Sequence, residues 1–312
     1  MLLGIKPTVD FAFKKIFGSP ENVAALIGLL NAILELAAPI VHVEILNPFS
    51  HQEFADDKLI VLDIRARDSA GRWFNIEMQV TVYSGLVQRL AYYACSLYVD
   101  QLEAGQDYAE LRPAISICLL NQVLFRDSPV AHHRFRLMDA VEQRVLGDTV
   151  EVHTVELTKY NLDEASLARA STIEQWAFFL LYADQYEPER LRELLPDRAF
   201  QQAVSAAETI ASKTEDRLMY DQRAKAQRDY HWAIESARRE GRQEGRQEGR
   251  QEGRQEGREE GVEKGLQVGK IQLVQQLLKE EPSSTDSLRG RSAEELSAML
   301  SDLQQRLRAR GH

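Results

Sequence analysis

Two neighbouring segments with alternating residues constrain the fold of this chain more than any other feature. The segments KLIVLDIRAR (58–67) and WFNIEMQVTV (73–82) have the alternation and the β-branched content of strands, and DSAGR (68–72) between them is typical of a turn. Paired as an antiparallel hairpin, these strands place Asp63 directly opposite Glu77. One face is then apolar and suited to helices, and a slip of one residue would mix apolar with polar side chains. The sequence therefore predicts a hairpin with one acidic face.

The acidic face gathers Asp63, Arg65, Glu77 and Gln79. Two carboxylates that face each other across strands repel unless a cation or a proton lies between them. With Gln79 roughly 7 Å along the strand from Glu77, this oxygen-only set suits a hard Mg²⁺ or Mn²⁺ ion that keeps several waters. Alternatively, Arg65 lies diagonal to Glu77 and neutralises the acids as a structural salt bridge. The residues alone leave both interpretations open.

The order of elements around this hairpin predicts an α/β core. A helix-like period precedes the hairpin, an alternating segment follows that helix, and a second helix and an apolar strand come after the hairpin. The predicted order is α-β-β-β-α-β, and two further segments extend the sheet. These elements are the helix 21–38, the strand 41–49, the hairpin, the helix 85–102, the strand 114–125 and the strand pair 132–139 and 150–157. We expect the core to span residues 1–160.

The rest of the chain is helical or low in complexity. We expect a helical extension over 161–238, a repeat over 239–270 and two amphipathic helices over 271–312, with capping signals near Ser283 and Ser292. The repeat EGRQ places Glu four residues from Glu and Arg four residues from Arg, so it lacks opposite-charge support along a helix. Each interior glycine also costs about 1 kcal/mol relative to alanine. The repeat is therefore either a linker or a helix that needs a partner, and we expect the tail to support a homo-oligomer.

Charge and composition limit the classes of protein that this chain can be. Its 312 residues are 44% hydrophobic and carry a formal net charge of -10, which argues against binding nucleic acid or anionic membrane through bulk charge. The apolar run 23–41 carries Asn31, Glu35 and Pro39, so we interpret it as a core helix and expect no membrane contact. Cys95 and Cys118 lie in apolar stretches and are expected to be reduced core residues. The start of the chain lacks the order of a signal peptide, and we expect a cytoplasmic protein.

Several motifs together resemble a known family. The α-β-β-β-α-β order, with Asp63 on one strand and Glu77-Met78-Gln79 on the next, resembles the PD-(D/E)XK nuclease superfamily. More narrowly, the segments DFAFKKIFG (10–18), LLNAIL (29–34) and 57–79, with the EGRQEG tail, look like the Rpn family of recombination-promoting nucleases, also described as PD-(D/E)XK nuclease family transposases. The resemblance is close in the first half of the chain, whereas the helical region and the tail are similar only in their general character.

The resemblance implies a Mg²⁺-dependent DNA endonuclease of a recombination or transposase type. Asp63, Glu77 and the backbone carbonyl of Met78 would be the metal ligands, and Gln79 stands where the superfamily usually has lysine. A metal lowers the pKa of a bound water and stabilises charge on the scissile phosphate, and Gln79 is able to orient that water but supplies no cation. Asp10 matches a family position and is expected to approach the acidic face. The alternative for Asp10 is an acid at a helix N-terminus.

Signals for contact with DNA are weaker. Gln88, Arg89 and Tyr92 lie on the helix after the acidic strand and are candidate phosphate contacts, although a solvated helix face explains them equally well. Lys14 is interpreted as ordinary surface charge. The chain has no P-loop, nucleophile elbow or glycine-rich dinucleotide turn. The alternative function is a catalytically inactive nuclease-fold module that binds DNA or protein, with the repeat as its working part.

Overall fold

The computed structural model describes residues 1–50 and 63–310, which form two compact units. The first unit is Met1–His231 and the second is Trp232–His312. The boundary between them falls within one helix, α9 (Thr214–Leu277). The first part of the predicted strand 58–67 lies outside the described residues.

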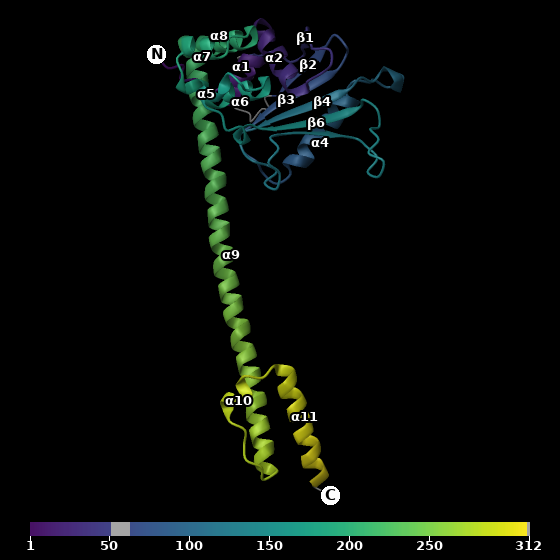
Figure 1. The fold of residues 1–312 in the computed structure, drawn as a ribbon, viewed down its shortest axis with the longest axis vertical. Coiled ribbons are helices and arrows are strands. Elements are labelled where there is room, and N and C mark those ends of the chain that lie inside the picture. The colour runs from purple at the N-terminus through teal and green to yellow at the C-terminus, as the bar shows by residue number, and fades with distance from the viewer. Residues whose placement is uncertain (51–62, 311–312) are drawn as a thin grey trace. The chain divides into compact units, whose positions relative to one another are not determined.

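A mixed sheet of six strands forms the centre of the first unit (Figure 1). The spatial order is β1-β2-β3-β4-β6-β5, in which β1, β2 and β3 are antiparallel, β3, β4 and β6 are parallel, and β5 runs antiparallel to β6. The strands are β1 (Val43–Ile45), β2 (Ile64–Asp68), β3 (Trp73–Gln79), β4 (Ala114–Leu120), β5 (His132–Arg136) and β6 (Val150–Glu156). With α2 before β1 and α4 between β3 and β4, the predicted α-β-β-β-α-β order is confirmed, and the predicted extra strand pair is present as β5 and β6.

The turn between β2 and β3 fixes the register of the hairpin. Asp68 accepts hydrogen bonds from the backbone N–H groups of Ala70 (3.0 Å) and Arg72 (2.9 Å), and its carboxylate also pairs with the Arg72 guanidinium. Gly71 has a φ of 81°, a left-handed conformation that favours glycine. With the turn held in this way, Ile64 pairs with Ile76. Continuing the register by one pair places Asp63 opposite Glu77, as predicted.

The two faces of the sheet are covered by different helices. Apolar residues of β2, β3 and β4, such as Ile64, Ile76 and Ile117, belong to the main core with α1, α2, α6 and α8. The other face packs against α4, whose Leu86 and Leu90 form a smaller cluster with Cys118 and Leu120. Figure 1 shows α4 on the opposite side of the sheet from α1, α2 and α6. Because side chains alternate along a strand, Glu77 lies on the face that α4 covers.

The predicted helical extension packs on the main core. Trp176 of α6 lies against Phe17 of α1 and Phe200 of α8, with ring centroids 5.5 Å and 4.1 Å apart.

The first long helix, α2, ends at Leu34, earlier than predicted. The next residue, Glu35, adopts a left-handed conformation with a φ of 46°. The helices of this unit before α9 are α1 (Asp10–Phe17), α2 (Val23–Leu34), α4 (Leu86–Val99), α5 (Glu164–Leu167), α6 (Thr172–Tyr182), α7 (Pro188–Leu194) and α8 (Arg198–Ser212).

The second unit contains the rest of α9 followed by α10 (Thr285–Arg289) and α11 (Ala293–Arg310). Helix α9 runs through the whole glycine repeat. The repeat is therefore a helix in this structure and not an irregular linker. Ser284 caps α10, one residue after the predicted signal, and Ser292 exchanges capping hydrogen bonds with Glu295 at the start of α11. The end of α9, α10 and α11 share a small apolar core that includes Ile271, Leu288, Leu296 and Leu303.

One cysteine differs from its prediction. Cys118 is buried in β4, whereas Cys95 is exposed on α4, so the interpretation of Cys95 as a core residue is wrong. Helix α4 has a single buried face, and Cys95 follows Ala94, which occupies that face.

No single helix among the described residues is long and apolar enough to cross a bilayer. Helix α1 and the segment Pro20–Leu34 reach the required length and composition only together, with a bend of 70° between them.

Candidate active site

Glu77 is the most enclosed acid of the hairpin. It is 4% exposed, and its Oε1 accepts hydrogen bonds from Gln79 Nε2 (2.5 Å) and Arg89 Nη2 (2.6 Å). Its other oxygen, Oε2, is buried and has no hydrogen-bond partner among the described residues. Burial raises the pKa of Glu77, the contacts with Gln79 and Arg89 oppose that rise, and the charge of Asp63 adds to it. Glu77 is thus a buried carboxylate with one unsatisfied oxygen beside a second acid.

Asp63 is held mainly through its backbone. Its carbonyl oxygen accepts hydrogen bonds from Lys14 Nζ (2.7 Å) of α1 and from Asn47 Nδ2 (3.0 Å), which follows β1. The Asn47 side chain also accepts a hydrogen bond from the backbone N–H of Arg65 (2.7 Å). The carboxylate of Asp63 lies 3.2 Å from Arg65 Nε and remains partly exposed. Two segments far away in the sequence therefore fix the main chain of Asp63 and leave its carboxylate accessible.

Lys14 differs from its predicted role. It is 1% exposed, so the interpretation of Lys14 as surface charge is wrong. Lys14 lies on the same face of α1 as Asp10, four residues earlier, but nothing local in the sequence places that face over the start of β2. Together with Asn47, Lys14 is a residue of the site that sequence reasoning missed.

The predicted salt bridge between Arg65 and both acids is replaced by two separate ion pairs. Arg65 pairs with Asp63, whereas Glu77 pairs with Arg89 of α4. The Arg89 guanidinium also donates to the Tyr83 hydroxyl (2.5 Å) and lies over the Tyr93 ring, 5.1 Å from its centroid. Arg89 was predicted to contact phosphate, and in this structure its guanidinium instead neutralises Glu77. Side-chain alternation places Glu77 on the face under α4, but it does not indicate which residue of α4 meets it.

The remaining residues predicted to contact DNA lie on the solvent side of α4. Gln88 and Tyr92 are exposed, and the ring of Tyr92 lies against that of Tyr93, with centroids 5.8 Å apart. They are accessible to a ligand, and no hydrogen bond or ion pair among the described residues joins them to Glu77. Their assignment to DNA stays a prediction.

Asp10 lies at the start of α1 and has its own partners. Its Oδ1 accepts from the Phe11 N–H (2.7 Å), and its Oδ2 pairs with the guanidinium of Arg223 in α9 (3.0 Å from Nε). This position matches the alternative of an acid at a helix N-terminus. Its predicted approach to the acidic face stays a prediction, because its hydrogen bonds among the described residues are with Phe11 and Arg223.

The site offers a hard cation only a small number of protein ligands. Among the described residues, no group of three or more His, Cys, Asp or Glu side chains is placed to hold a metal ion. Asp63 and Glu77 form a pair of acids, and the unsatisfied Oε2 of Glu77 is free to accept a cation. Mg²⁺ is usually bound through one or two carboxylates, with waters and substrate phosphates as its other ligands. The residues present therefore fit Mg²⁺ bound in that manner and do not form a closed cage.

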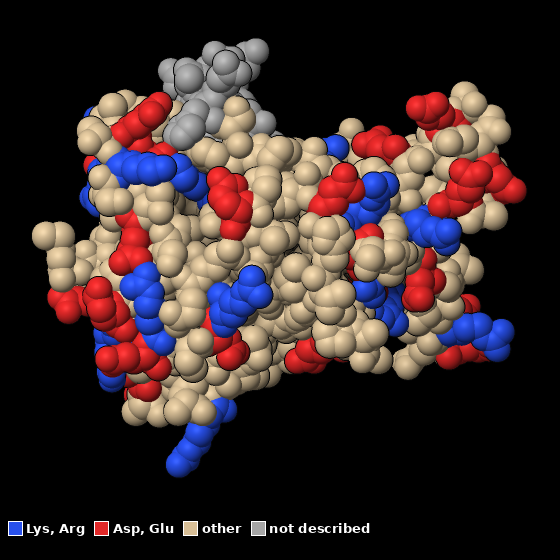
Figure 2. Space-filling model, turned by 90° about the horizontal axis from the view of Figure 1, so that it is seen from above, with Lys and Arg blue, Asp and Glu red and all other residues tan. Residues whose placement is uncertain are grey.

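Charges of both signs are mixed on the surface of the chain. Figure 2 shows Lys and Arg side chains interspersed with Asp and Glu across the face that it draws. With a net charge of -10, contact with a phosphate backbone has to be local.

Comparison with known proteins agrees with the fold. A family model described as PD-(D/E)XK nuclease family transposase matches residues 7–237. A second model, described as Essential protein Yae1, N terminal, matches residues 237–272, which contain the glycine repeat. No curated protein and no solved structure matches the chain.

Proposed function

Because this chain belongs to the PD-(D/E)XK nuclease family transposases, whose model covers residues 7–237, we propose that it is a metal-dependent DNA endonuclease. The proposal includes the narrower Rpn assignment, a role in recombination or transposition, and action in the cytoplasm. The observation that carries it is the buried, unsatisfied Oε2 of Glu77 beside the second acid, Asp63. Buried polar groups are normally satisfied, so a buried oxygen without a partner beside a second acid is a candidate cation ligand.

Asp63 and Glu77, with the backbone carbonyl of Met78, would hold Mg²⁺ or Mn²⁺. When bound, the metal supplies a water of lowered pKa and stabilises charge on the scissile phosphate. The rest depends on residues of this chain. Lys14 and Asn47 fix the main chain at Asp63, and the charge of Arg89 opposes the rise in the pKa of Glu77 that burial causes.

Gln79 has a positioning role in this proposal. Its amide nitrogen donates to Glu77 Oε1 at 2.5 Å, which orients the amide and leaves its oxygen free to accept a hydrogen bond from a water near the acids. Gln79 adds no positive charge where the superfamily has lysine. In this chain the positive charges beside the two carboxylates come instead from Arg89, which pairs with Glu77, and from Arg65, which pairs with Asp63.

The test is nicking of supercoiled plasmid by the purified protein with Mg²⁺, with Mn²⁺ and with EDTA. Glu77→Gln keeps the shape of the side chain and removes its charge, and Glu44→Gln, at an exposed acid of β1, is the matched control. We expect metal-dependent nicking by the wild type and by Glu44→Gln, and none by Glu77→Gln. Absence of nicking by the wild type with both metals would refute the endonuclease proposal and favour the inactive DNA-binding or protein-binding module.

A second readout does not depend on cleavage. A ligand that binds only the folded state raises thermal stability. Mg²⁺ should therefore raise the melting temperature of the wild type and of Glu44→Gln, but not that of Glu77→Gln. An equal rise in all three proteins would place the metal elsewhere.

A further inference from the structure

Helix α9 carries an exposed apolar stripe in the second unit. Val262, Leu266, Leu273 and Leu277 are 58%, 61%, 56% and 60% exposed. At 100° per residue these four positions fall within about 60° of one another around the helix. They therefore form one line of apolar side chains along α9.

The opposite face of α9 is already covered within the unit. Val268, Ile271, Val274 and Leu278 are buried in the small core that α9 shares with α10 and α11. The helical hairpin thus packs on one side of α9 and leaves the stripe of Val262 to Leu277 on the other. An exposed apolar line of this kind on a charged helix is typical of a protein interface.

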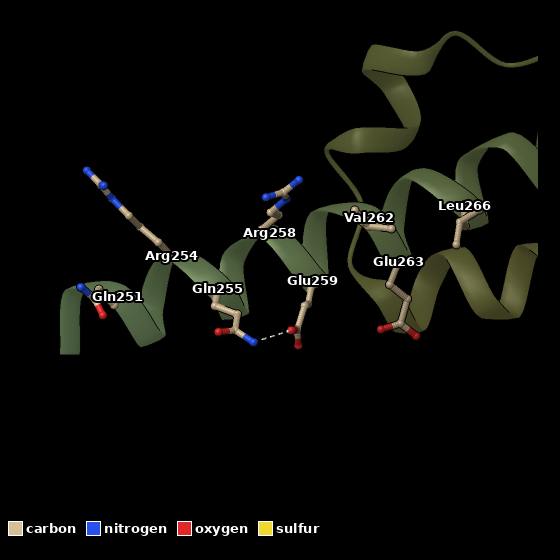
Figure 3. Close-up of a pocket in the computed structure, with 8 residues that line it drawn as sticks. All are labelled: Gln251, Arg254, Gln255, Arg258, Glu259, Val262, Glu263 and Leu266. Carbon is tan, nitrogen blue, oxygen red and sulfur yellow. Dashed lines mark hydrogen bonds between the residues drawn. The ribbon is translucent and has the colours of Figure 1, made fainter. Parts of the chain in front are cut away.

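The stripe has edges of opposite charge. Figure 3 shows Arg254 and Arg258 pointing to one side of the helix and Glu259 and Glu263 to the other, with Val262 and Leu266 between them. Arg254, Arg258 and Glu263 have no hydrogen-bond or ion-pair partner among the residues that the structure describes. Within each edge, residues four apart carry the same charge and repel each other. The charges of each edge are therefore not compensated within this helix.

We propose that this face binds a second copy of the chain, with the two α9 helices parallel. A two-fold axis along the pair places the arginine edge of one helix against the glutamate edge of its partner on both sides of the apolar stripe. An antiparallel pair places arginine against arginine and glutamate against glutamate. The distribution of charge thus selects both the partner and its direction, and it does so independently of any nuclease activity.

The first test is the oligomeric state of the full-length protein by sedimentation velocity over a range of concentrations. We expect a dimer for the wild type and a monomer for the double variant Leu266→Glu, Leu273→Glu. Leu146→Glu, at a leucine of the first unit that is 71% exposed, is the matched control and should remain dimeric. Circular dichroism checks that the helices are retained. A monomeric wild type, or a double variant that dimerises like the control, would overturn the proposal.

Charge reversal tests the direction. Arg258→Glu alone should weaken the parallel dimer roughly fivefold, since an exposed pair is lost on each side and replaced by repulsion. Adding Glu263→Arg to the same chain should restore the dimer, because the two edges are then exchanged. In an antiparallel dimer the new glutamate would lie along the arginine edge of the partner, so Arg258→Glu would not weaken that dimer. A dissociation constant that fails to rise would therefore refute the parallel arrangement.

Disulfide formation gives an independent check. In a Cys95→Ser background, Leu266→Cys should cross-link two copies readily under mild oxidation, because residues at the same level meet in a parallel pair; Cys118 is buried and does not interfere. Leu146→Cys in the same background should not cross-link. Equal cross-linking of the two variants would contradict the proposed interface.

Discussion

Replacement of Arg89 by methionine tests whether the Arg89 guanidinium stabilises a charged Glu77 carboxylate in its buried position. Methionine keeps much of the apolar stem of arginine and removes the guanidinium that lies 2.6 Å from Glu77 Oε1. Removing one partner of a buried ion pair costs about 3–5 kcal/mol, but Arg89 is 27% exposed, so water compensates part of the loss.

Protonation of Glu77 also limits the cost. With an ordinary pKa of 4.5, keeping the carboxyl neutral at pH 7 costs about 3.4 kcal/mol, because each pH unit corresponds to about 1.4 kcal/mol. The wild type already bears part of this cost, since burial raises the pKa of Glu77 even with Arg89 in place. We therefore expect Arg89→Met to lower the free energy of unfolding by about 1–3 kcal/mol at pH 7 without metal.

The pH dependence has a definite sign. The Arg89 charge lowers the pKa of Glu77, so its removal raises that pKa further above 4.5. Below pH 4.5 the carboxyl is neutral in both folded and unfolded chains and the variant loses little through this pair. The loss relative to the wild type grows as the pH rises from the folded-state pKa of Glu77 in the wild type to its higher folded-state pKa in the variant, and is then constant.

Urea unfolding at pH 7 and at pH 4.5 measures the difference. Arg67→Met is the matched control, because Arg67 pairs with Glu44 at an exposed site and its loss should cost at most about 1 kcal/mol at either pH. If Arg89→Met destabilises the chain equally at both pH values, the loss comes from packing and the reasoning about the buried charge is refuted.

Three further predictions concern residues around the hairpin. Asp63→Asn should reduce plasmid nicking by at least about a hundredfold and remove the Mg²⁺-dependent rise in melting temperature, because it removes one of the two charges that attract the metal. Lys14→Met should destabilise the fold by about 1–3 kcal/mol, since the carbonyl of Asp63 loses a buried donor, and a loss of nicking larger than that of equally destabilised variants elsewhere would identify a positioning role. Gly71→Ala should lower the free energy of unfolding by about 1 kcal/mol or more in urea, because φ is 81° there and the added Cβ lies 3.2 Å from the Arg112 side chain; an unchanged midpoint would contradict the role given to this turn.

The acidic hairpin could be predicted from the sequence because the information is local. Alternation fixes which side chains share a face, the turn from Asp68 to Arg72 fixes the register, and the two together bring Asp63 opposite Glu77. The same local patterns placed the other strands and the helices, with differences at their ends such as the stop at Glu35. Local rules therefore accounted for the acid pair and for the order of elements.

The partners of the two acids could not be predicted in the same way. Lys14 and Asn47 meet the main chain of Asp63 only because α1 and the end of β1 pack beside β2, and Arg89 meets Glu77 only because α4 crosses that face of the sheet. These contacts depend on packing between elements, which sequence spacing does not encode. Cys95 shows the same limit, because an apolar neighbourhood in the sequence did not reveal which side of α4 faces solvent.

The hydrogen bonds that Lys14 and Asn47 donate to the backbone carbonyl of Asp63 matter for the interpretation of related sequences. A chain that keeps both acids but has lost the lysine of α1 or the asparagine after β1 would retain the apparent catalytic signature with its first acid no longer held in place. Activity can therefore disappear through substitutions far from the acids in sequence, while the most visible motif persists. Residues 14 and 47 should accordingly be inspected together with residues 63 and 77 before a relative is assigned as a working enzyme.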